Sequence, residues 1–162
     1  MNVKWIVIHT AAAANENGIF YPTIDDVDRW HRERGWSMIG YHFFIEKDGT
    51  EKVGRPVNKA GAHTRGLNDE AIGICVSGHG DLVDFNAEQM TTLIKVVKRE
   101  LNNFSLTIDN VIGHREVHEI AGAPPPNKSC PGTKVSMDGI RQRLAVGQVK
   151  DFCNDFNKKG KE

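Results

Sequence analysis

The sequence predicts an α/β fold, in which a central mixed β-sheet is flanked by helices within a single domain. Short apolar runs rich in β-branched residues alternate along the chain with segments whose apolar residues recur at helical spacing. The length of 162 residues allows one domain with a sizeable core and is too short for two domains that each bury a stable core. We therefore expect one domain over residues 1–162, with a helical segment and a frayed tail at 146–162.

The composition excludes several classes of protein. The 21 basic and 21 acidic residues balance to zero, so charge does not favour binding to nucleic acid or to an anionic membrane. No stretch has the length of a membrane span or the pattern of a secretory signal, which predicts synthesis in the cytoplasm without a signal peptide. The cysteines Cys75, Cys130 and Cys153 are odd in number and widely spaced, so they are expected to be thiols.

The first elements are a strand, a helix and a hairpin. The β-branched and aromatic run from Val3 to His9 predicts a buried strand. Thr23 is expected to cap a helix that ends before Gly35 and that carries His31 on its solvent-exposed surface. Further on, an aromatic run leads into Asp48-Gly49, which predicts antiparallel strands at about 41–46 and 51–54.

The second half continues the alternation of strands and helices. Residues 56–69 fit neither periodicity and are expected to form an ordered loop near the sheet edge, before an apolar strand at 71–76 that buries Cys75. Asn86 with Gln89 resembles a capping box that opens the clearest amphipathic helix. Val111-Ile112 predicts a short strand, and helical turns are expected at 136–144 and 149–156, with Cys153 on their apolar face.

Two histidines follow predicted strands, and a cysteine ends a proline-rich loop. His9 and His114 lie at the carboxyl ends of strands, the edge at which open α/β sheets bind ligands. With Cys130 they offer the ligand types that Zn²⁺ prefers, and three protein ligands leave a fourth position for water, as in catalytic zinc sites. Lys128 would then stabilise a developing oxyanion, and Tyr41 would hydrogen-bond the attacking water or the intermediate.

Other interpretations of these residues stay open. Cys130 with His114 is also the pair that a thiol hydrolase needs, although His9 would then have no role. Metal content separates the two kinds of enzyme. A buried cysteine and a loop histidine that never meet would serve packing alone.

Several short segments, in order and in rough spacing, resemble the zinc-dependent N-acetylmuramoyl-L-alanine amidases, which include amidase-type bacteriophage lysozymes and the animal peptidoglycan recognition proteins. The resemblance covers about residues 3–145. The connection between His114 and Cys130 is longer than is usual in the family, and the extra part is expected at 121–126. The matching segments are Ile8-His9, Gly40 to Phe43, Asp48 to Thr50, Gly54-Arg55, Gly61 to His63, Asn68, Ile72 to Ile74, Gly113 to Arg115 and Cys130 to Gly132.

The resemblance implies hydrolysis of the amide between N-acetylmuramic acid and L-alanine in peptidoglycan, as in phage endolysins. By position, it implies one Zn²⁺ per chain held by His9, His114 and Cys130, with Tyr41 and Lys128 as catalytic helpers. A wall of the substrate groove is expected from a further set of loop residues: His63, Thr64 and Asn68.

Two further roles stay open beside this one. A non-catalytic peptidoglycan-binding module would keep the fold and usually lacks the cysteine ligand, which this chain has. The phage resemblance also implies a possible second role as a protein inhibitor of a phage RNA polymerase, which a pull-down with the polymerase would test. We expect a monomer that acts on the cell wall after its release.

Overall fold

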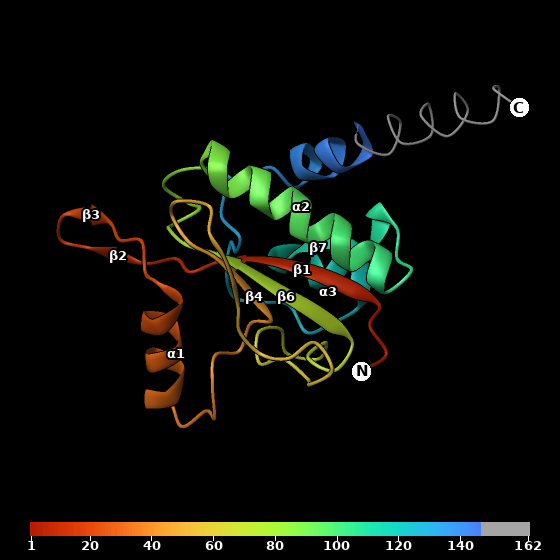
Figure 1. The fold of residues 1–162 in the computed structure, drawn as a ribbon, viewed down its shortest axis with the longest axis horizontal. Helices are drawn as coiled ribbons and strands as arrows, with labels where there is room; N and C mark the ends of the chain where they lie inside the picture. The colour runs from red at the N-terminus through yellow and green to blue at the C-terminus, as the bar shows by residue number, and fades with distance from the viewer. Residues whose placement is uncertain (147–162) are drawn as a thin grey trace, which may run out of the picture.

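The computed structural model describes residues 1–146, so the helical turns predicted at 149–156, Cys153 and the tail lie outside the described residues. A five-stranded mixed sheet forms the centre of the molecule, in the order β5-β4-β6-β1-β7 (Figure 1). Strands β4, β6, β1 and β7 run parallel, and β5 pairs antiparallel with β4. This confirms the predicted mixed sheet. The bounds are β1 Trp5–Thr10, β4 Phe43–Ile45, β5 Glu51–Val53, β6 Ala71–Val76 and β7 Val111–Gly113.

Both predicted capping residues begin helices. Thr23 opens α1 (Ile24–Glu33) and Asn86 opens α2 (Ala87–Asn103), and each makes a reciprocal capping box with the residue three positions on. Short 3₁₀ turns, η1 (Ile108–Asn110) and η2 (His114–Glu116), flank β7. Residues 137–146 are helical, in agreement with the turns predicted from 136 onward.

The two faces of the sheet differ in what they contact: one packs in the main core, and the other carries His9. On one face, α2 lies across the strands (Figure 1). Together with the helix at 137–146 it packs against Ile6 and Ile8, and these elements enclose the main core. Because side chains alternate along a strand, Val7 and His9 point to the other face. There, two smaller apolar clusters form against α1 and against α3 (Val117–Ala121). His9 therefore lies on the face that the main core leaves free.

The structure departs from the local predictions at three places. Between β1 and α1, where no strand was predicted, lies a hairpin of β2 (Ala14–Asn15) and β3 (Gly18–Ile19), and Gly18 has a φ of 107°. Part of the loop expected between His114 and Cys130 forms α3, which ends at the left-handed Gly122. The strand expected at Val3–His9 begins and ends later, at Trp5–Thr10.

His31 is buried, which corrects the prediction that it lies on the solvent-exposed surface. The backbone N–H of Gly40 donates to His31 Nδ1 at 3.0 Å, and the ring of Trp36 lies 4.6 Å from the imidazole. Burial lowers the pKa of His31 to about 4. The chain turns back after α1 and covers this histidine, a tertiary contact that helical spacing alone does not reveal.

Within the described residues, no helix has the length and apolar character needed to cross a membrane.

Candidate metal centre

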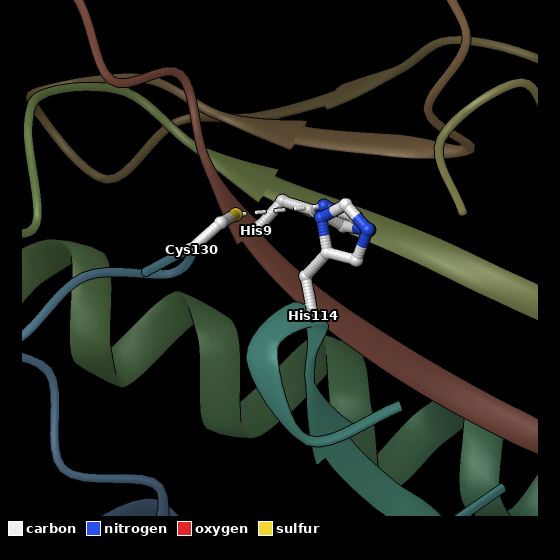
Figure 2. Close-up of side chains that lie close together, drawn as sticks. All are labelled: His9, His114 and Cys130. Atoms are coloured by element: carbon white, nitrogen blue, oxygen red, sulfur yellow. Dashed lines mark hydrogen bonds between the residues drawn. The ribbon is translucent and has the colours of Figure 1, made fainter. Parts of the chain in front are cut away.

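His9, His114 and Cys130 come together at one point, although they are far apart in the sequence. One ligand atom from each lies within 4.8 Å of the others, close enough for a single metal ion to reach all three. Figure 2 shows the two imidazoles and the thiol converging from three separate segments. The His9 Nδ1 atom lies 3.7 Å from Cys130 Sγ, so Nδ1 is the His9 nitrogen that faces the cluster.

The sheet places the two histidines side by side. His9 is near the carboxyl end of β1, and His114 directly follows β7, which pairs in parallel with β1. Carboxyl ends of parallel strands meet at the same edge, and the two ring centroids lie 4.6 Å apart. The sequence prediction of two histidines at one sheet edge is confirmed.

Hydrogen bonds from both sides hold the loop that carries Cys130. The N–H of Arg115 donates to the carbonyl of Cys130 at 2.7 Å, and the Arg115 guanidinium donates to the carbonyl of Gly132 at 2.6 Å. From the other side, the Asp81 carboxylate accepts from the Ser129 hydroxyl at 2.6 Å and from the Thr133 N–H at 2.7 Å. These contacts fix a candidate ligand, Cys130, that no strand or helix carries.

Burial sets the protonation of the three ligand side chains. It is the main cause that lowers the pKa of His9 well below its usual value and that of His114 to about 4, with Lys128 as a further cause at both. Both imidazoles are therefore neutral at pH 7, as metal binding requires. Burial raises the pKa of the Cys130 thiol to about 11. Without a metal this thiol is a poor nucleophile, which disfavours a thiol hydrolase.

The two predicted catalytic helpers line the same cavity. A cavity of about 200 Å³ is bordered by Tyr41, Lys128 and all three ligand residues. The Tyr41 ring lies 5.1 Å from the His9 ring, and burial raises the pKa of Tyr41 well above its usual value. Its hydroxyl thus stays protonated and able to donate. Lys128 is exposed on the loop before Cys130, and its charge contributes to the lowered pKa of His9 and of His114.

His63, Thr64 and Asn68 line an adjoining cleft of about 450 Å³. The segment 124–128, within the connection between His114 and Cys130, also lines this cleft. Thr64 is buried, and the Asn68 side-chain oxygen accepts from the backbone N–H groups of His63 and Thr64, both at 2.8 Å. His63 also contacts a ligand residue, since its Nδ1 lies 3.1 Å from His9 Nε2.

The prediction from sequence did not include the residues that brace the ligands. Glu116 is the clearest of them, because its carboxylate accepts from the N–H of Gly113 at 2.7 Å and from the Arg141 guanidinium at 3.0 and 3.1 Å. Arg141 also donates to the carbonyl of Val111 at 3.1 Å. The only sequence feature that pointed to Glu116 as a supporting residue was its position two residues after His114.

Replacing Glu116 with glutamine is expected to lower the free energy of unfolding by about 1.5–3 kcal/mol at pH 7, the range for hydrogen bonds to charged groups. Burial alone would raise the pKa of Glu116, but hydrogen bonds from Arg141 and Gly113 outweigh it and lower the pKa below its usual value. Because the folded-state pKa is depressed, this stability is present above the unfolded value and is lost as the pH falls through the folded one. Urea denaturation of both proteins at pH 7 and pH 3 measures the difference. An equal difference at both pH values would contradict the ionic role.

Known proteins of similar sequence and similar fold identify the family of this chain. The family model described as N-acetylmuramoyl-L-alanine amidase matches residues 1–133. The endolysin of Escherichia phage T7 is 30% identical over 127 residues, which are 78% of this chain and 78% of the endolysin. The solved N-acetylmuramoyl-L-alanine amidase LysC from Clostridium intestinale is 33% identical, with a TM-score of 0.76 over 89% of this chain and 86% of LysC. Drosophila PGRP-LB has a TM-score of 0.66 at 25% identity, over 82% of this chain and 76% of that one. The family model matches most of this chain, and the solved amidase shares its fold. This chain therefore belongs to the N-acetylmuramoyl-L-alanine amidase family.

Proposed function

We propose that the protein is a zinc-dependent hydrolase that cleaves the amide between N-acetylmuramic acid and L-alanine in peptidoglycan. The observation that carries this proposal is the convergence of His9, His114 and Cys130 within 4.8 Å. Two neutral imidazoles and one thiol are a donor set that fits Zn²⁺, and a tetrahedral ion held by three side chains keeps one position open. A module that only binds peptidoglycan would not need this arrangement.

Each residue around the ligands has a distinct task in the proposed reaction. When bound, zinc supplies a Lewis acid and lowers the pKa of a coordinated water to about 7. The Tyr41 hydroxyl, neutral at all physiological pH values, donates a hydrogen bond in the cavity. The Lys128 ammonium borders the same cavity and stabilises the negative charge that develops on the amide oxygen. Within residues 1–146, Lys128 has no carboxylate partner, so its charge is available to the substrate.

The cleft of about 450 Å³ beside the ligands is the proposed substrate groove. We assign His63, Thr64 and Asn68 to one wall and residues 124–128, which also line the cleft, to a second wall. Prolines at 124, 125 and 126 restrict the backbone of this second wall, so the groove is largely formed before substrate binds.

We further propose that the biological role is lysis of the bacterial cell wall, since the similar phage proteins are endolysins. The decisive experiment is digestion of purified peptidoglycan. We expect new muramoyl carboxylates and free L-alanine amino termini, without new reducing sugars. New reducing sugars alone would mean that the enzyme cuts glycan strands and would overturn the proposal.

Zinc is expected to bind at one ion per chain with release of about one proton at pH 6. Both histidines are already neutral at that pH, whereas the Cys130 thiol, with a pKa of about 11, must lose its proton to become a ligand. Titration calorimetry of metal-free protein in two buffers of different ionisation enthalpy measures the released proton. Chelation should remove the activity and added Zn²⁺ should restore it. A metal-free preparation with full activity would refute the zinc requirement.

A further inference from the structure

His63 contacts a metal-ligand residue at the nitrogen that faces away from the cluster. His9 presents Nδ1 toward Cys130, so its Nε2 must carry the proton when Nδ1 binds a metal. Such an N–H needs an acceptor in a buried site. The nearest one is His63 Nδ1 at 3.1 Å, and the Thr64 hydroxyl is more distant at 3.4 Å.

The other contacts of His63 determine which of its nitrogens is free to accept. His63 Nε2 lies 3.3 Å from the carbonyl of Ala71, which accepts only, so Nε2 carries the hydrogen. Nδ1 of a neutral imidazole then holds the lone pair. Two groups that can donate lie within hydrogen-bond distance and share this one lone pair: the Nε2–H of His9 at 3.1 Å and the Thr64 hydroxyl at 2.9 Å. A chain of hydrogen bonds thus runs from the Ala71 carbonyl through His63 to His9.

The backbone around His63 is built to hold the ring in this place. A Cβ at Gly73 would lie 2.5 Å from the His63 ring, and a Cβ at Gly61 would lie 2.4 Å from it. The imidazole therefore fills space that two absent side chains leave open. Asn68 fixes the backbone on either side by accepting from the N–H groups of His63 and Thr64.

We propose that His63 is a positioning residue for the metal ligand His9, in addition to forming part of the groove wall. Its Nδ1 accepts the Nε2–H of His9 and thereby fixes the tautomer and the orientation in which His9 Nδ1 binds zinc. Metal-bound histidines generally donate their second N–H to such a partner, and removing the partner typically weakens metal binding about 10–100-fold. This inference rests on the proposed zinc function.

The test measures zinc affinity by competition with a chelator, which does not depend on activity. His63→Phe keeps a ring in the space beside Gly61 and Gly73 but has no acceptor, so we expect about 10–100-fold weaker zinc binding. His63→Gln restores an acceptor and should recover part of the loss. Thr64→Val leaves His63 Nδ1 available and should stay within about threefold of the parent. His118→Phe, a histidine replacement outside the metal cluster, is the matched control and should not change the affinity.

Each result bears on the proposal separately from the zinc function. If the parent binds no zinc, the proposed function fails. If the parent binds zinc and His63→Phe binds it equally well, only the role of His63 fails. If Thr64→Val weakens binding and His63→Phe does not, the acceptor is the Thr64 hydroxyl and the proposal is overturned.

Nitrogen NMR of the histidine rings tests the same point in the unaltered zinc-loaded protein, so poor folding of a variant does not prevent a decision. We expect His63 and His9 to be protonated at Nε2, and His63 Nδ1 to have the shift of an unprotonated nitrogen. A proton on His63 Nδ1 would exclude it as the acceptor.

Discussion

Replacing Cys130 with serine is expected to remove zinc at ordinary free-zinc concentrations and to lower turnover at least about 10³-fold, equivalent to ~4 kcal/mol in the barrier. A serine hydroxyl does not ionise as a thiol does, and it is a much weaker ligand for zinc. The fold should persist, because the main core lies on the opposite face of the sheet around α2. Zinc content, circular dichroism and peptidoglycan hydrolysis measure the three effects.

Cys75→Ser is the matched control, since it also replaces a buried thiol with a hydroxyl. Cys75 lies in β6 outside the metal cluster, so this variant should keep its zinc. If Cys130→Ser unfolds the protein while Cys75→Ser does not, the metal is structural. If Cys130→Ser retains both zinc and turnover, the ligand assignment is wrong.

Lys128→Ala and Tyr41→Phe are each expected to lower kcat about 10²–10³-fold, or about 2.7–4 kcal/mol, the usual cost of losing one donor to a developing oxyanion. Both side chains border the cavity beside the ligands, and neither belongs to the metal cluster. Zinc content, folding and peptidoglycan binding should therefore remain. A donor that acts mainly in the transition state affects kcat more than substrate binding.

Two substitutions of the same kind away from the site provide controls. Lys134→Ala removes another exposed loop lysine, and Tyr21→Phe alters the only other tyrosine of the sequence. Both should hydrolyse peptidoglycan at the parental rate. Turnover within about threefold of the parent for Lys128→Ala and Tyr41→Phe, only ~0.7 kcal/mol in the barrier, would require both assignments to be withdrawn.

Features that depend on neighbouring residues were predicted well. The capping boxes at Thr23 and Asn86 are local hydrogen-bond patterns, and both begin helices in the structure. His9 and His114 were placed together because parallel strands bring their carboxyl ends to one edge. Cys130 was a candidate because a thiol suits Zn²⁺, and the family resemblance supported it, but its loop has no periodicity from which its position follows.

Features that depend on distant contacts could not be predicted. His31 has charged neighbours in the sequence and a helical position typical of surface residues, yet the segment around Trp36 and Gly40 covers it. The contact of His63 with His9 joins residues 54 positions apart and requires the missing side chain at Gly73. Neither contact leaves a pattern in a short window of sequence.

The support for the metal ligands extends beyond the part of the chain that the family model matches, which ends at residue 133. The helix at 137–146 supplies Arg141, and Arg141 holds Glu116 and the turn that presents His114. Ile140 and Leu144 of the same helix are buried in the main core. If His114 binds zinc as proposed, metal affinity and the docking of this helix are linked thermodynamically. The bound ion would then favour the docked helix, and fraying of the helix would favour release of the ion.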